Sequence, residues 1–152
     1  MQSNVISEQA ESCSEQGNEY PFCYPTFTDV WRNGSTYDFI WNFNYPYYVQ
    51  HEYLNLYLYY YIKFEYKNVK NFTRLDQSLG SVKVTVDDSW FLSPLEPGSL
   101  DLNLTLYGFY LPSTENVTEE LSNPISMYPR PFNFTITRKY FNITCKDGIS
   151  FR

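Results

Sequence analysis

Six asparagines carry the acceptor pattern for N-linked glycosylation, in which a sugar is transferred to the side-chain amide nitrogen. These N-x-[ST] acceptors are Asn33, Asn71, Asn103, Asn116, Asn133 and Asn142. Chance alone would give roughly two such matches in a chain of this composition. The excess predicts a glycoprotein of the secretory-pathway lumen, in the endoplasmic reticulum or Golgi, or of the cell surface.

The three cysteines, Cys13, Cys23 and Cys145, fit an oxidising compartment. Two pairings are open: Cys13 with Cys23 would close a short loop, and Cys23 with Cys145 would join the first strand to the last. The sequence contains neither a CxxC motif nor a Cys/His cluster of the kind that binds a metal, so we expect neither a metal nor a cofactor. The odd number, with polar N-terminal residues that lack a signal peptide, favours a fragment of a longer chain.

Few residues are of the types that catalyse reactions. His51 is the single histidine, and no serine or cysteine motif accompanies it. Asp87 and Asp88 could form half of a calcium site or of a glycosidase pair, but neighbours on an extended chain point to opposite faces. We therefore interpret His51 as a surface histidine and the two aspartates as a turn at a strand end. The chain is predicted not to be an enzyme.

A run of alternating residues, LNLYLYYYIKFEY, offers a binding surface instead. If the leucines of this run pack inward, Tyr57, Tyr59 and Tyr61 form an outward aromatic ladder with steps of about 7 Å. Exposed contiguous aromatic side chains stack on sugar rings or cover a protein partner. The alternative is that a neighbouring loop buries this strand on both faces.

Composition indicates which elements must position these residues. Aromatic residues make up 20% of the chain, against 18% charged residues, and Ala10 is the only alanine. Aromatic residues favour pleated strands and not helices, which predicts an all-β domain. The net charge of −6 excludes a broad basic footprint for nucleic acid or for an anionic membrane surface. No apolar run is long enough to span a bilayer, so any membrane contact is expected only through an anchor outside this sequence.

Alternating patterns and turn residues predict seven strands, which is typical of an immunoglobulin-like β-sandwich. We place these strands at 24–31, 36–44, 53–66, 69–75, 80–87, 100–110 and 132–141. The register puts Trp41 and Leu104 into one core, and it puts Asn103 and Asn133 on outward faces. The segment 112–131 is expected to be the longest loop. The domain boundaries are a polar leader at 1–22, the sandwich at 23–145 and a tail at 146–152.

The order of these motifs resembles the small Ig-like domain of fungal cell-wall and secretory-pathway glycoproteins of the Kre9/Knh1 type. The resemblance covers roughly residues 24–137 and rests on Pro25, Trp31, Gly34-Ser35-Thr36, Trp41, Leu54, Leu56, Leu58, Gly80-Ser81-Val82 and the strand from Phe132 to Ile136. It implies an immunoglobulin-like fold in a non-catalytic lumenal or extracellular domain. Among proteins with such domains, some assist wall-glucan assembly and some assist the maturation or trafficking of membrane cargo.

Two functional hypotheses follow. The first is a glycosylated interaction domain of a fungal secretory-pathway protein, whose partner is another protein of that pathway. The second is a carbohydrate-binding module for cell-wall polysaccharide in β-glucan assembly, with Tyr57, Tyr59 and Tyr61 as stacking platforms.

Overall fold

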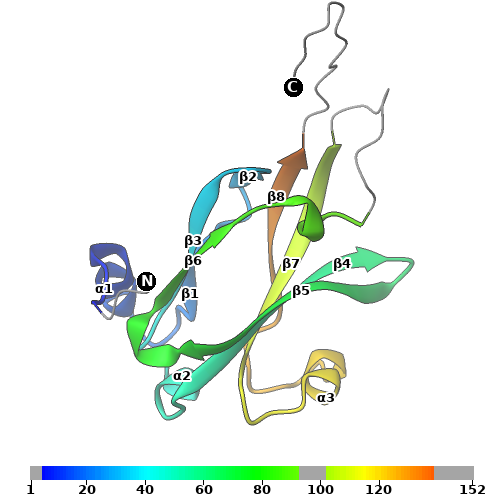
Figure 1. The fold of residues 1–152 in the computed structure, drawn as a ribbon. Coiled ribbons are helices and arrows are strands. Elements are labelled where there is room, and N and C mark those ends of the chain that lie inside the picture. Colours follow the sequence, from blue (N-terminus) through cyan, green and yellow to red (C-terminus); the bar gives the residue numbers. More distant parts are fainter. Residues whose placement is uncertain (1–4, 93–101, 139–152) are drawn as a thin grey trace, which may run out of the picture.

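Two β-sheets form the protein in the computed structural model, which describes residues 5–92 and 102–138 (Figure 1). The smaller sheet contains three strands: β1 (Phe22–Tyr24), β3 (Thr36–Trp41) and β6 (Ser81–Thr85). The larger sheet contains five: β2 (Val30–Arg32), β4 (Tyr53–Ile62), β5 (Glu65–Asp76), β7 (Leu102–Pro112) and β8 (Phe132–Arg138). The expected all-β sandwich is therefore confirmed, with eight strands in place of seven.

Strand order identifies the immunoglobulin arrangement. The order is β1-β3-β6 in the small sheet and β2-β8-β7-β4-β5 in the large one. The first strand of the fold is divided, because β1 pairs with β3 whereas β2 crosses to the other sheet and runs parallel to β8. The cis peptide Tyr24–Pro25 lies at this crossing. All other pairings are antiparallel, as in Greek-key sandwiches.

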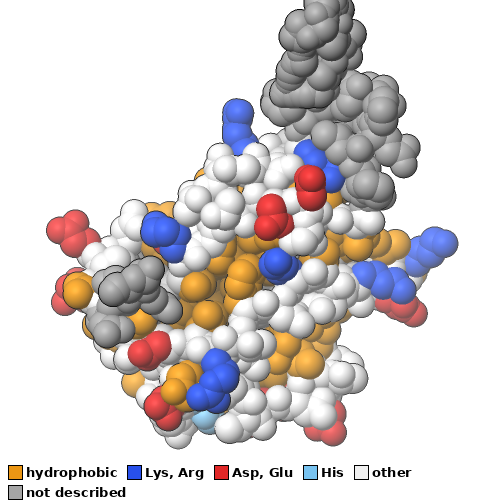
Figure 2. Space-filling model, in the orientation of Figure 1, with side chains coloured by type: hydrophobic (Ala, Val, Ile, Leu, Met, Phe, Trp, Pro, Cys, Tyr) orange, Lys and Arg blue, Asp and Glu red, His pale blue; other side chains and the backbone are white. Residues whose placement is uncertain are grey.

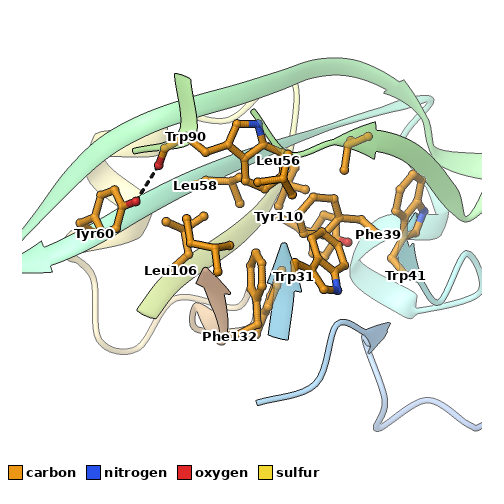
Figure 3. Packing of buried hydrophobic residues seen from close by; sticks show 14 of the residues in the cluster. Trp31, Phe39, Trp41, Leu56, Leu58, Tyr60, Trp90, Leu106, Tyr110 and Phe132 are labelled. Carbon is orange, nitrogen blue, oxygen red and sulfur yellow. Dashed lines mark hydrogen bonds between the residues drawn. The ribbon is translucent and has the colours of Figure 1, made fainter. Parts of the chain in front are cut away.

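The inward faces of both sheets meet in an aromatic core (Figure 3). Phe39 and Trp41 of β3 are completely buried, and Leu104 of β7 packs against the same cluster, which confirms the expected register. The Trp41 and Tyr110 rings lie 5.6 Å apart and connect the sheets. Immunoglobulin domains commonly join these sheets by a disulfide. Within the described residues, aromatic contacts take that place.

Several strand bounds differ from the prediction, and the differences in two strands have a clear structural cause. The predicted strand 24–31 is divided into β1 and β2 because the chain changes sheets there. The predicted strand 53–66 ends earlier, since β4 stops at Ile62 and the chain reverses through Lys63 and Phe64 into β5. Ile62 then pairs with Glu65.

Three short α-helices, which the sequence patterns did not predict, fill the connections: α1 (Glu8–Ser14), α2 (Pro46–Val49) and α3 (Val117–Ser122). Helix α1 lies within the predicted polar leader, yet its Ala10 and Cys13 are buried against Ile40 of β3. Part of the leader thus packs onto the sandwich. Helix α3 lies in the predicted long loop between β7 and β8.

Candidate functional site

The predicted tyrosine ladder lies on the outer face of β4, but it is not continuously exposed. Tyr61 is 48% exposed, whereas Tyr59 is only 6% exposed and Tyr57 is half-buried. On the opposite face of the strand, Tyr60 is buried in the core, where its Oη donates a hydrogen bond to the Trp90 carbonyl at 2.6 Å (Figure 3). Of the two alternatives that the sequence left open, the structure supports burial by a neighbouring loop for Tyr59, whereas Tyr61 stays exposed.

The covering loop is the segment that contains α3. Tyr59 clusters with Phe109, Leu111 and the buried Tyr128, and Leu121 of α3 packs against this group. Arg130 fastens the segment, because its guanidinium donates hydrogen bonds to three carbonyls at the end of α3, those of Glu120, Leu121 and Asn123. A helix end leaves such carbonyls without intrahelical partners, and a cation there also interacts favourably with the negative end of the helix dipole.

Burial changes the acidity of these tyrosines. It raises the pKa of Tyr59 to about 12, and the neighbouring Tyr57 adds to the rise. Burial also raises the pKa of Tyr66, with the Arg130 charge opposing the change. Both shifts follow from the partial covering of this outer face, because burial disfavours the charged phenolate.

Three tyrosines remain accessible at the end of this face and form what we call the tyrosine cluster: Tyr61 of β4, Tyr66 of β5 and Tyr107 of β7. The ring centroids of Tyr61 and Tyr66 lie 4.9 Å apart. The Tyr107 centroid lies 6.1 Å from that of Tyr61 and 5.9 Å from that of Tyr66. Tyr59 supports Tyr66 from below at 5.6 Å. The cluster is thus held by mutual ring contacts in one arrangement.

Three glycosylation acceptors are exposed on the same outer face. Asn71 faces Tyr57 across the β4–β5 pair, and Asn133 faces Tyr107 across the β7–β8 pair. Asn103 is exposed further along β7, so the predicted outward positions of Asn103 and Asn133 are confirmed. Side chains of directly opposed residues share one face of a sheet. A glycan on any of these asparagines would project from the face that carries the tyrosine cluster.

The remaining acceptors differ in environment. Asn116 is exposed and caps α3, with its Oδ1 accepting from the Glu119 N–H at 3.1 Å, which leaves the sugar-accepting nitrogen outside this bond. Asn33 is half-buried, and its Nδ2 donates to Asp88 at 2.9 Å. Asn142 lies outside the described residues.

The structure chooses one of the two open cysteine pairings. Cys13 of α1 and Cys23 of β1 form a disulfide that ties the N-terminal helix to the small sheet. Cys145 lies outside the described residues.

The candidate catalytic residues have structural partners. Asp87 begins a short 3-10 helix and accepts hydrogen bonds from Ser89, which lower its pKa. Asp88 instead contacts Asn33 and the buried Arg138, the latter at 3.6 Å. His51 is half-buried beyond the end of α2. Within residues 5–92 and 102–138, no group of three or more histidine, cysteine or acidic side chains could hold a metal ion.

A cavity of about 410 Å³ beside the β1–β2 crossing also contains two carboxylates. Asp29 accepts a 2.7 Å hydrogen bond from the Thr26 N–H, and Asp38 forms an ion pair with Lys83 at 3.3 Å. Each carboxylate thus has a partner within the local fold.

Among the exposed aromatic residues that the sequence interpretation did not single out, Phe64 is the most exposed in the described part of the chain. It lies in the two-residue turn of the β4–β5 hairpin and is 89% exposed. Lys63 and Phe64 both have positive φ, at 53° and 66°. Two consecutive left-handed residues are typical of a type I′ hairpin turn, for which Asn-Gly is the usual signal. Here no such signal was present.

The chain matches no protein-family model, no curated protein and no solved structure. The resemblance to fungal wall and secretory proteins therefore stays a prediction. Among the described residues, no helix combines the length and the apolar character that a membrane crossing requires.

Proposed function

We propose that this chain is a non-catalytic, glycosylated interaction domain of a lumenal or cell-surface protein, and that it binds a protein partner through the tyrosine cluster. The observation that carries the proposal is the half-open group of Tyr61, Tyr66 and Tyr107 at the end of a face that the α3 segment partly covers. The fungal secretory pathway, and a role in maturation or trafficking of membrane cargo, rest on the sequence resemblance alone.

Ring geometry favours a protein partner over a polysaccharide. Tyr61 is inclined by 57° to Tyr66 and by 60° to Tyr107, and Tyr66 is inclined by 77° to Tyr107. A sugar chain stacks successive rings on a row of accessible aromatic faces, and the buried Tyr59 interrupts the row on β4 that would have supplied them. A rigid group of tilted tyrosines instead offers apolar edges and hydroxyl groups, the combination that is enriched at protein interfaces.

Glycans would restrict the direction of approach. Sugars on Asn71 and Asn133 would stand beside Tyr57 and Tyr107: Asn71 lies further along β5, and Asn133 lies on the neighbouring strand β8. Tyr61 lies four residues beyond Tyr57 along β4, a distance of about 13 Å in an extended strand. The hairpin end of the cluster therefore stays open, and we expect the partner to approach from that end.

The predicted localisation in the secretory pathway is tested by the intact mass of the natively produced protein before and after enzymatic removal of N-glycans. We expect a loss of mass, with occupied sites that include Asn103 and Asn133, the two acceptors exposed on β7 and β8. An unchanged mass would contradict the secretory address.

The interaction is tested by co-purification from the producing cells after cross-linking, with partners identified by mass spectrometry. The double substitution Tyr61→Ser and Tyr66→Ser is expected to abolish capture of the specific partner. Tyr24→Ser is the matched control, because Tyr24 is 48% exposed, as Tyr61 is, but lies on the small sheet. Equal capture by the double variant and the control, with both folded by tryptophan fluorescence, would refute the assignment of this surface.

A further inference from the structure

The turn of the β4–β5 hairpin carries an apolar end that nothing in the fold accounts for. We define the hairpin tip as Ile62, Lys63, Phe64 and Glu65. Phe64 is 89% exposed and Ile62 is 36% exposed. In Figure 1 this turn projects sideways from the sandwich, beyond the ends of the neighbouring strands. Single exposed apolar side chains are common on protein surfaces, so the significance of this one depends on the backbone and the charges around it.

The backbone conformation of the turn is a second feature of Phe64 that the stability of the fold does not explain. Lys63 and Phe64 adopt left-handed conformations, which are rare for residues with bulky side chains. Asn-Gly would make the same turn without this strain. Because Phe64 is almost fully exposed, the strain is not offset by packing of its ring in the described fold. Such uncompensated strain is concentrated at functional sites.

Charge is distributed unevenly between the tip and the rest of the chain. Between Ile62 and Lys70 lie three lysines and one glutamate, which gives this segment a net charge of +2, whereas the whole chain carries −6. Lys67 and Glu65 form an exposed ion pair at 3.3 Å. Figure 2 shows basic side chains together with an acidic one at the right edge of the molecule, over the end of this hairpin. The net charge of the chain therefore conceals a local basic region.

The side chains are also graded with distance from the turn. Phe64 is at the apex, and the Tyr61–Tyr66 pair follows directly behind the Ile62–Glu65 pair. Lys63 lies beside Phe64 at the apex, and Lys67 follows the tyrosines. An apolar side chain at the apex can enter the acyl chains while tyrosines lie at the interface and the long lysine side chains extend back to headgroup phosphates.

We propose that the hairpin tip inserts Phe64 into the surface of a phospholipid bilayer, with Lys63 and Lys67 binding headgroup phosphates. A convex tip with one apolar apex fits a deformable lipid surface. The tip itself is neutral, because Lys63 and Glu65 balance, and the positive charge that complements phosphate belongs to the longer segment 62–70. This surface adjoins the tyrosine cluster and adds a second contact to the proposed function. Contact at both surfaces would hold the domain beside a membrane-embedded partner.

The test is co-sedimentation of the glycosylated chain with phosphatidylcholine vesicles that contain or lack phosphatidylserine. We expect binding that is stronger with phosphatidylserine and weakens as salt is raised. Phe64→Ser is expected to reduce the partition coefficient by about tenfold or more, which corresponds to losing the burial of one phenylalanine. The double substitution Lys63→Ser and Lys67→Ser should abolish the preference for phosphatidylserine.

Phe27→Ser is the matched control, because Phe27 is also a highly exposed phenylalanine, at 76%, but lies between β1 and β2. It should bind vesicles as the unchanged chain does. No sedimentation of the unchanged chain, or equal loss in the Phe64→Ser and Phe27→Ser variants, would overturn the proposal.

Partner capture separates this proposal from the proposed function. In detergent extracts, Phe64→Ser should still capture the protein partner that the Tyr61→Ser, Tyr66→Ser variant loses. If the chain does not bind vesicles, only the membrane proposal for the hairpin tip is refuted. If the Tyr61→Ser, Tyr66→Ser variant still captures the partner, only the proposal for the tyrosine cluster is refuted.

Discussion

Three non-glycine residues of the described chain have positive φ, and all lie on the β4–β5 hairpin: Arg74 near its base, and Lys63 and Phe64 at its turn. The backbone conformations are alike, with φ between 53° and 66°. The surroundings are opposite. Arg74 is held by groups of the fold, whereas Phe64 is exposed to solvent.

At the base of the hairpin, the fold compensates the strain. The pairing of β4 with β5 shifts between Leu54 and Leu56, which places a β-bulge opposite Asn55. The buried Asn55 accepts a 2.9 Å hydrogen bond from the Arg74 N–H, and its own Nδ2 donates to the Tyr57 hydroxyl. The Arg74 guanidinium lies 4.2 Å from the centre of the Tyr53 ring. A bulge that receives this many interactions is a structural feature, and it shapes an edge strand against unwanted pairing.

At the turn, the comparable strain receives no such support from the described residues around Phe64. The difference teaches how to interpret unusual backbone conformations: strain that is matched by buried polar contacts serves the fold, and strain beneath an exposed apolar side chain points to a partner. The two ends of one hairpin thus have different roles.

The largest expected effect is at the base. Asn55→Ala removes the acceptor of the Arg74 N–H and leaves a cavity, so we expect a loss of about 3 kcal/mol in the free energy of unfolding. Urea unfolding followed by tryptophan fluorescence measures it well, because Trp31, Trp41 and Trp90 are all buried. The exposed Asn18 provides the control substitution Asn18→Ala, which should change stability by less than about 0.5 kcal/mol. A similar small change for Asn55→Ala would show that the bulge does not depend on its amide.

The second prediction compares the covered and open parts of the outer face by pH. The folded protein holds the proton of Tyr59 more tightly than the unfolded chain, because its pKa is raised from 10.0 to about 12. The stabilising contribution is therefore complete below pH 10 and decreases as pH rises toward 12, where the unfolded state ionises first. We expect Tyr59→Phe to gain about 2 kcal/mol relative to the unchanged chain between these limits.

Urea unfolding of both proteins at several alkaline pH values gives this difference directly. Other buried tyrosines affect both proteins equally and cancel. A difference that does not vary with pH would mean that Tyr59 is in contact with water, and the α3 segment would then not cover it.

Much of the sandwich could be predicted because strands with one buried face alternate in sequence. Phe132, Phe134 and Ile136 are inward as the pattern indicates, and Asn133 between them is outward. The burial of Tyr59 could not be assigned in this way, since it depends on Tyr128 and Leu121, which are distant in sequence. Helix α1 was missed because a seven-residue polar segment has little helical pattern, and its position is fixed by the disulfide.

The hairpin turn was missed for a different reason, and the smallest predicted effect tests it. Lys63 and Phe64 are not turn-forming residues, so local sequence preference disagrees with the backbone at this point. Replacing them by the usual pair, Lys63→Asn with Phe64→Gly, should relieve the left-handed strain and raise the free energy of unfolding by about 1 kcal/mol. The same substitution should abolish vesicle binding, measured by co-sedimentation, because it removes the apolar apex. A more stable protein that has lost its membrane contact would show that stability was exchanged for function at the turn, whereas lower stability would show that the native residues support the fold.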